Sequence, residues 1–319
     1  MYQKNHLTIV MYHYVRELAD SRYPEIKGLS VENFKNQLDY FAKHYTFIRM
    51  EDCLHSLKYH KPLPEKALLL TFDDGYIDHF LHVFPILSER NIQGSFFPPA
   101  KTIMENCLLD VNKIHHILAA VTNKQLLLEE VYRLINVYRH HYSLKTPQDY
   151  ASSIQDTSRY DTKEVVFIKC LLQRDLPYPA RTQITNDLFS KYIQINERVF
   201  SKELYMDIKQ IKLMKHYGMF IGSHSYDHVW MNTLSEEEQE HEVIKSCDFL
   251  HELNIDTKNW VMCYPYGEYN ESLIHILKKH HCQLGLTTRV DIANLIPEHA
   301  FTLPRLDTND FPVTENHPH

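Results

Sequence analysis

Residues 68–76 constrain the fold of this chain more than any other stretch. The apolar residues 67–70 are typical of a strand that is buried on both faces, as in a parallel sheet. The strand runs into Asp73, Asp74 and Gly75, and burying two adjacent carboxylates is costly unless a cation compensates. Taken alone, Asp-Asp-Gly is most often a solvated turn. Here it follows a buried strand, and α/β proteins place their chemistry at such strand ends, which favours a functional site.

Length and composition exclude several classes of protein. With 319 residues, of which 44% are hydrophobic and 24% charged, the chain can form one large α/β domain or two smaller ones. The net charge of -7 argues against a general nucleic-acid-binding protein, because no basic excess is available to neutralise phosphates. No apolar run approaches the roughly 20 residues of a membrane span.

The cysteines and the N-terminal residues bear on the cellular compartment. The six cysteines are scattered and form no Cys-x-x-Cys pair, a pattern typical of reduced, mostly buried thiols. Residues 1–6 are not followed by a signal-type apolar stretch. We therefore expect a cytoplasmic protein. The sequence predicts no particular oligomeric state.

Strand-like and helical segments alternate along both ends of the chain. The predicted strands are residues 7–12, 46–48, 67–70, 93–97, 219–221, 260–263, 284–288 and 301–306. The predicted helices between them are residues 50–59, 77–90, 202–217, 235–253 and 271–281, together with one capped by Ser30. Roughly seven or eight strand-helix steps favour a barrel-like α/β fold over an open sheet.

The middle of the chain has a different pattern. Amphipathic helical segments such as residues 126–138 and 163–172 follow one another with no convincing strand between them. We interpret residues 103–200 as a helical insertion between two parts of a barrel, residues 1–102 and 201–319. The insertion is either structural cover or a lid that affects substrate specificity, and both interpretations stay open.

Two histidines follow another predicted strand. His224 and His228 are four residues apart, and such a pair is usually a coincidence in a chain with 22 histidines. Two features favour a functional site: the pair follows a buried strand, and Gly222 allows a close turn. Two histidines and one carboxylate suit zinc, with positions left open for water and substrate. Asp73 or Asp74 could supply the carboxylate.

With these residues, the chain resembles the polysaccharide deacetylase family, carbohydrate esterase family 4. The resemblance rests on residues 71–75 (Thr-Phe-Asp-Asp-Gly), 224–228 (His-Ser-Tyr-Asp-His) and 264–267 (Tyr-Pro-Tyr-Gly), in the family's order. It covers roughly residues 65–100 and 202–310, and the third motif is the least specific.

The resemblance implies a fold and a set of site residues. The fold is a distorted (β/α) barrel of about seven strands. Asp73 would be the general base, and Asp74, His224 and His228 would hold Zn²⁺ or another divalent transition metal. The amide N–H in the Tyr266 region would help to bind the oxyanion. The chemistry is coherent, because a metal lowers the pKa of bound water and polarises the carbonyl while Asp73 takes the proton.

The chain departs from the family pattern in two places. The family often has an arginine two residues before the proline of the third motif, where this chain has Cys263. Arg305 could replace it, although a structural ion pair is about equally plausible. The family's late Leu-x-His motif is not visible. Some members instead begin with a strand that ends in Tyr-His, as residues 12–13 do here, so His13 is the candidate general acid; a strand-end histidine bonded to backbone is the rival interpretation.

These observations lead to one main hypothesis and two rivals. The main hypothesis is a metal-dependent deacylase that hydrolyses the N-acetyl or N-formyl group of an amino sugar in surface-glycan biosynthesis or modification. We expect a nucleotide-linked, lipid-linked or oligosaccharide substrate, and neither a nucleic-acid partner nor a membrane span. The rivals are a sugar O-deacetylase with the same residues and a glycan-binding protein that has lost catalysis on the same scaffold.

Overall fold

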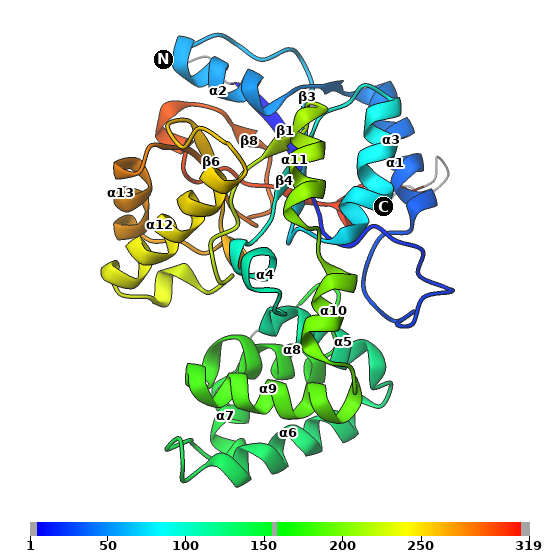
Figure 1. Ribbon diagram of the computed structural model, residues 1–319, viewed down its shortest axis with the longest axis vertical. Helices are drawn as coiled ribbons and strands as arrows, with labels where there is room; N and C mark the ends of the chain where they lie inside the picture. Colours follow the sequence, from blue (N-terminus) through cyan, green and yellow to red (C-terminus); the bar gives the residue numbers. More distant parts are fainter. Residues whose placement is uncertain (1–4, 155–157, 314–319) are drawn as a thin grey trace. The chain divides into compact units, whose positions relative to one another are not determined.

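The computed structural model describes residues 5–154 and 158–313 (Figure 1). Residues 1–4, which belong to the segment without a signal-type stretch, lie outside this range. The chain divides into two compact units. Unit 1 comprises residues 1–17, 28–107 and 201–319, and unit 2 comprises residues 18–27 and 108–200. Within the described part of the chain, no helix combines the length and the apolar character needed to cross a membrane.

All of the described strands lie in unit 1. They are β1 (His6–Tyr12), β2 (Thr46–Phe47), β3 (Ala67–Asp73), β4 (Gly94–Phe97), β5 (Phe220–Ile221), β6 (Trp260–Cys263), β7 (Cys282–Leu286), β8 (Ala293–Asn294) and β9 (Leu306–Asp307). The helices that begin and end in this unit are α1 (Val31–His44), α2 (Met50–Tyr59), α3 (Phe84–Glu89), α4 (Ala100–Glu105), α11 (Ile208–His216), α12 (Glu236–Glu252) and α13 (Glu271–Lys279).

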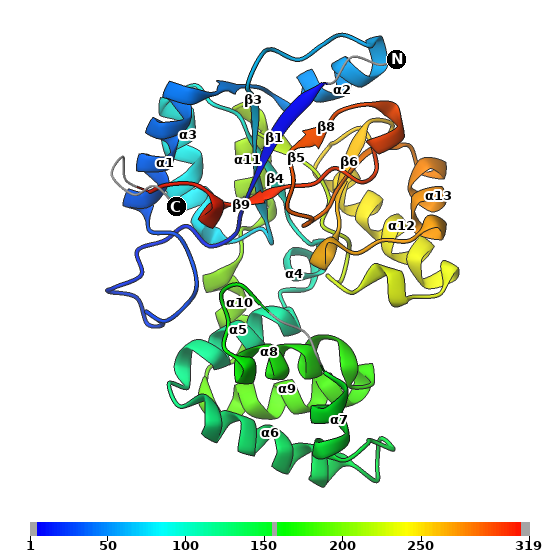
Figure 2. The same ribbon diagram turned by 180° about the vertical axis from the view of Figure 1, so that it is seen from behind.

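The strands form a distorted barrel, as predicted. Parallel ladders run from β9 through β1, β3 and β4 to β5, and a second parallel ladder joins β6 to β7. Two single parallel bridges, Ser223 with Met262 and Leu286 with Leu303, connect the two ladders on either side. The ring of strands therefore closes, but two of its seams consist of one bridge each. Figure 2 shows β1, β3, β4 and β9 side by side.

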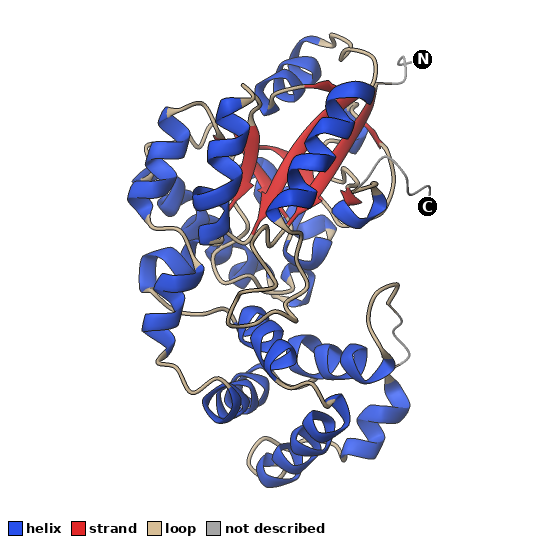
Figure 3. Cartoon of the chain, turned by 90° about the vertical axis from the view of Figure 1, so that its right-hand side faces the viewer, coloured by secondary structure: helices blue, strands red, loops and turns tan. Residues whose placement is uncertain are grey.

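Alternation along the strands divides the core into two clusters. Leu68, Leu70 and Phe72 of β3 pack in the cluster that contains residues of α1, α3 and α11. Ala67 and Leu69 of the same strand belong to the other cluster, with residues of β6 and β7. Successive side chains of a strand point to opposite faces, so one face of β3 meets the helices and the other fills the barrel. The helices around the strands are drawn in blue in Figure 3.

The structure corrects two of the predicted elements. The strand predicted for residues 301–306 is wrong over most of its length: only the Leu303 bridge and β9 are present, since Pro304 has no backbone N–H to extend a ladder. The helix predicted for residues 202–217 is two helices, α10 (Glu197–Leu204) and α11. Met206 donates its N–H to the carbonyl of Gly75, and Asp207 then caps α11. Strand β8 was not predicted.

The regular secondary structure of unit 2 is all helical among its described residues. It contains α5 (Asp110–Ala120), α6 (Lys124–Tyr138), α7 (Pro147–Ser153), α8 (Lys163–Cys170) and α9 (Tyr178–Tyr192). Residues 18–27 also belong to it, although they precede it by about 80 positions in the chain. Lys27 forms an ion pair with Asp161, and the ring of Tyr23 packs edge-on against His116. Sequence pattern did not indicate this association, because residues 18–27 contain no regular element.

Candidate active site

The two aspartates are positioned by the end of β3. Asp73 is the last residue of the strand and Asp74 begins the following turn, and both are buried. Asp74 and Gly75 have φ angles of +71° and +67°. A Cβ on Gly75 would lie 2.7 Å from Cβ of Pro98, so this turn requires glycine. The amide of Asp74 donates to the carbonyl of Phe97 in β4 at 3.1 Å. The strand end and the turn thereby direct the adjacent carboxylates of Asp73 and Asp74 toward different partners.

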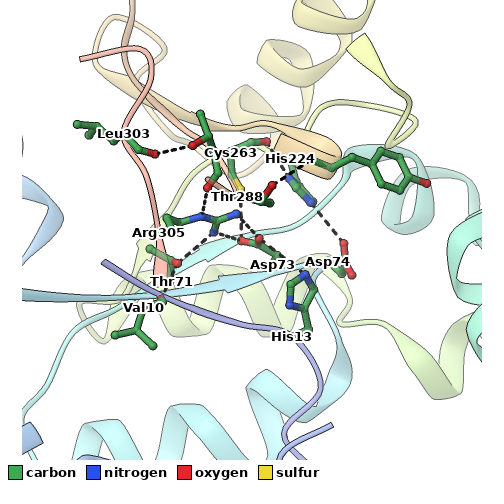
Figure 4. A network of polar contacts seen from close by, with 12 residues as sticks. Val10, His13, Thr71, Asp73, Asp74, His224, Cys263, Thr288, Leu303 and Arg305 are labelled. Atoms are coloured by element: carbon green, nitrogen blue, oxygen red, sulfur yellow. Dashed lines mark hydrogen bonds and ion pairs between the residues drawn. The ribbon is translucent and has the colours of Figure 1, made fainter. Parts of the chain in front are cut away.

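Three side chains form a candidate metal site. Nε2 of His224 and Nε2 of His228 lie 3.5 and 3.3 Å from Oδ1 of Asp74. One ligand atom from each of the three residues lies within 4.8 Å of the others. The Nδ1–H of His224 donates to the carbonyl of Cys263 at 2.7 Å, so Nε2 is the ring nitrogen that faces Asp74 (Figure 4). Oδ1 of Asp74 is buried with no hydrogen-bond partner among the described residues. These inward-facing donor atoms fit a divalent metal.

The turn between the two histidines is held by its own contacts. The carboxylate of Glu242 on α12 accepts hydrogen bonds from the amides of Tyr226 and Asp227, each at 3.0 Å. The amide of His228 donates to Oγ of Ser225 at 3.0 Å. Burial lowers the pKa of His228, which favours the neutral imidazole that binds metals. Sequence reasoning missed Glu242, because only the fold brings α12 to this turn.

Asp73 is held by a buried arginine. Arg305 donates from both terminal nitrogens to the two carboxylate oxygens at 2.9 and 2.7 Å. It also donates to the carbonyl of Thr287 and the hydroxyl of Thr71, and it is 0% exposed (Figure 4). Burial acts to raise the pKa of Asp73, but the charge and hydrogen bonds of Arg305, together with the charges of His224 and His13, outweigh it and lower the pKa to about 2. Asp73 is therefore ionised and fixed in orientation.

Replacing Arg305 with methionine should destabilise the protein by about 3–5 kcal/mol, because a buried carboxylate loses its ion partner. The wild-type folded pKa of Asp73, about 2, lies below the ordinary value of 3.8, so this stabilisation is present above pH 3.8 and is lost as the pH falls through 2. Urea unfolding at pH 7 measures the loss. Arg133→Met, at a surface ion pair, is the control and should change little. Equal midpoints for wild type and Arg305→Met would contradict the interpretation.

Two further side chains lie beside Asp73. Nε2 of His13 lies 4.0 Å from Oδ2 of Asp73, and the His13 side chain is 39% exposed. The thiol of Cys263 donates to Oδ1 at 3.4 Å, and burial raises the pKa of this thiol. The guanidinium partner of Asp73 is thus Arg305 and not a side chain at position 263. His13 lies at the same strand edge as the metal cluster.

Tyr266 lies beside His228. Its backbone has φ +58° and its carbonyl accepts a hydrogen bond from the hydroxyl of Thr288 at 3.1 Å. Its ring packs edge-on against His228, with centroids 4.8 Å apart, and is stacked on Trp230 at 4.5 Å. The adjacent Gly267 has φ +77°, and a Cβ there would lie 2.2 Å from Oγ1 of Thr288. The close turn at residues 265–267 therefore belongs to the residue whose ring packs against His228.

Sequence reasoning missed Tyr76 as a site residue. Its buried hydroxyl donates to Oδ2 of Asp74 at 2.5 Å, while Oδ1 of the same carboxylate faces the histidines. The ring is stacked between Tyr14 and Tyr205, with centroid separations of 4.0 and 6.2 Å. The available signal was its position two residues after Asp74. The hydrogen bond fixes which oxygen of Asp74 is presented to the metal cluster.

Comparisons with known proteins identify the family of this chain. The model of the polysaccharide deacetylase family matches residues 60–166 and 182–285, which include both aspartates and both histidines. The chain belongs to the polysaccharide deacetylase family. The family implies a carbohydrate substrate.

Two curated proteins match only short segments of the chain. YxkH of Bacillus subtilis (strain 168), which is named for the same family, is 30% identical over 86 residues, or 27% of this chain and 30% of YxkH. The poly-beta-1,6-N-acetyl-D-glucosamine N-deacetylase of Escherichia coli (strain K12) is 70% identical over 27 residues, or 8% of this chain and 4% of that protein. The chain therefore covers less than a third of either relative.

A solved structure covers nearly the whole chain. The deacetylase PplD of Streptococcus pyogenes, solved in complex with acetate, superimposes with a TM-score of 0.60 at 18% identity, covering 96% of this chain and 93% of PplD. At that identity the likeness concerns the fold. The match extends over residues of both units of the chain, the helical unit included.

Proposed function

We propose that this protein is a zinc-dependent hydrolase that removes the N-acetyl, or alternatively the N-formyl, group from an amino sugar of a surface glycan. One observation carries the proposal: a buried Asp74–His224–His228 cluster lies next to a second buried carboxylate, Asp73, which is paired with and oriented by Arg305. A cluster of metal ligands beside a separate buried carboxylate is what metal-assisted hydrolysis requires, whereas a glycan-binding module has no use for both.

The three ligands supply one carboxylate oxygen and two imidazole nitrogens. This donor set suits zinc, and the buried Oδ1 of Asp74, with no hydrogen-bond partner among the described residues, fits a bound cation. When bound, such a cation lowers the pKa of water and polarises a carbonyl oxygen. Tyr76 and the Cys263 carbonyl orient Asp74 and His224 for this purpose.

Asp73 is the proposed general base. Its ion pair with Arg305 keeps it ionised at neutral pH and directs its oxygens, although the same charge reduces its basicity. The amide N–H in the Tyr266 region is the proposed oxyanion donor. Its support is the constrained turn at residues 265–267, which lies against ligand His228.

His13 is the proposed general acid. An amide anion is far too basic to leave unaided, so the sugar nitrogen needs a proton as the C–N bond breaks. The partly exposed imidazole beside Asp73 is suitably placed to give it. Proton donors of this kind contribute about 10²–10⁴-fold.

His13→Ala should therefore lower kcat on an N-acetyl sugar by about 10²-fold or more. It should matter much less for an ester with a good leaving group, which needs little protonation. Metal content should be unchanged. Acetate release from N-acetylglucosamine oligomers and from 4-nitrophenyl acetate measures both effects. Equal, small losses on the two substrates would contradict the role of general acid and favour a structural role for His13.

The substrate is proposed from chemistry and from one relative. The short, 70% identical segment of the Escherichia coli enzyme named for poly-beta-1,6-N-acetyl-D-glucosamine favours an N-acetylglucosamine polymer or oligomer. A nucleotide-linked or lipid-linked precursor uses the same reacting group. Incubation of the zinc-loaded protein with N- and O-acetylated oligosaccharides and with UDP-N-acetylglucosamine, followed by acetate and formate assays, decides among them. Release only from O-acetyl esters identifies an O-deacetylase, and no release from any of them favours a binding protein.

A further inference from the structure

His79 is a buried histidine that the proposed reaction does not use. It begins the π-helical turn His79–Val83 and is 0% exposed. Its Nε2 lies 2.8 Å from the backbone carbonyl oxygen of His13. Because a carbonyl oxygen only accepts, Nε2 carries the proton and donates it to this bond. The ring of His79 thus anchors the backbone of the proposed general acid.

The remaining surroundings of His79 are mainly aromatic. Its ring contacts Phe72, Tyr76 and Phe96, with centroid separations of 5.6, 5.7 and 5.6 Å. Nδ1 is buried and has no hydrogen-bond partner among the described residues. A buried ring nitrogen without a partner is destabilising, and a phenylalanine would fill such a cage without that penalty. Burial also lowers the pKa of His79, so the ring stays neutral. The bond to His13 is what histidine adds at this position.

A second contact fixes the same segment of chain. Asp78, the neighbour of His79, is buried and accepts two hydrogen bonds from Arg16 at 2.7 and 2.9 Å. Residues 78 and 79 therefore hold both ends of residues 13–16. The imidazole of His13 itself is 39% exposed and, at 4.0 Å, lies too far from Asp73 for a hydrogen bond. The direction in which it points thus depends on how its backbone is held.

We infer that His79 is a positioning residue, which holds the backbone of His13 so that the His13 imidazole stays beside Asp73. The inference rests on the proposed function, in which His13 protonates the leaving amine. In this role His79 transfers no proton: its N–H remains on Nε2, and the proton that reaches the sugar nitrogen comes from His13.

The test compares two substitutions of the same residue. His79→Phe fills the aromatic cage without a donor, whereas His79→Gln keeps a side-chain N–H near the position of Nε2. With the zinc-loaded protein, His79→Phe should lower kcat on N-acetylglucosamine oligomers at least about 10-fold, a part of what loss of the acid costs. It should leave KM, zinc content and turnover of 4-nitrophenyl acetate within about 3-fold. His79→Gln should restore most of the loss. His82→Phe, three residues further along, is the matched control and should behave as wild type.

A double variant and a structure separate the possible outcomes. His13→Ala/His79→Phe should be no slower than His13→Ala, because His79 acts only through His13. Losses that multiply, an equal fall on amide and ester, or no rescue by glutamine would overturn the inference. If the wild type releases no acetate, the proposed function fails, but crystal structures still test the positioning claim. The His13 imidazole should leave Asp73 in His79→Phe and return in His79→Gln, and an unmoved imidazole would refute it.

Discussion

Asp73→Asn is expected to abolish turnover while leaving zinc content close to normal. An asparagine keeps the size of the side chain but cannot accept a proton as a carboxylate does, so a loss of at least about 10³-fold is expected. The proposed ligands are Asp74, His224 and His228. Asp73 is not one of them, so Asp74 should keep its contacts with both histidines in this variant. Acetate release together with metal analysis of the same preparation measures the two properties.

The control for this prediction is the neighbouring residue. Asp74→Asn should empty the metal site, because it removes the charge that compensates the cation. If Asp73→Asn lost the metal and Asp74→Asn retained it, the roles of the two acids would be exchanged. Asp73→Asn also removes the negative partner of buried Arg305, so its unfolding should be followed in parallel to exclude loss of the fold.

His224→Ala and His228→Ala are each expected to lose stoichiometric zinc and, with it, nearly all activity. Both rings direct Nε2 at the same oxygen of Asp74, so removal of either leaves only two protein ligands, fewer than the three of a typical catalytic zinc site. Metal analysis after dialysis against a weak chelator is the direct measurement. It does not depend on knowing the substrate.

The control is an exposed histidine of the same unit. His241 lies on the solvent side of α12, and His241→Ala should retain one zinc per chain. Full zinc retention by both His224→Ala and His228→Ala would rule out this metal site. Retention by only one of them would show that the other histidine and Asp74 suffice, and that the third ligand is dispensable for binding.

The local elements were predictable because their signals are local. The helix predicted for residues 50–59 has those bounds in the structure, and Ser30 and Ser235 cap α1 and α12 as their sequences indicate. The apolar run before Asp73 forms a fully buried strand of a parallel sheet. The family could also be recognised from three short motifs, since each is contiguous in the chain. The helix break at Asp207 had a local signal as well, the capping box with Gln210, but the longer apolar pattern obscured it.

The candidate site was only partly predictable, because its supporting contacts join distant residues. The aspartates and the histidine pair carry recognisable spacing. Arg305 could be named only as an alternative to a structural ion pair, and the fold brings its guanidinium to Asp73 across 232 residues. The contacts of Tyr76, His79 and Glu242 have no periodic pattern or short motif that specifies their partners. Each is a single hydrogen-bonding side chain whose acceptor or donor is defined by tertiary packing.

By itself, the sequence determined the secondary structure of most of unit 1 and the barrel class. Those properties follow from hydrophobic periodicity, capping and the ends of buried strands, all of which act over a few residues. Only the tertiary structure decided that the barrel closes through two single bridges, that residues 18–27 join the helical unit, and that Asp73 pairs with Arg305 while Asp74 meets the histidines. The physical reason is that the strand end at Asp73 and the turn that begins at Asp74 direct two neighbouring carboxylates differently, and which partner each one finds depends on strands and loops that only the closed barrel brings together.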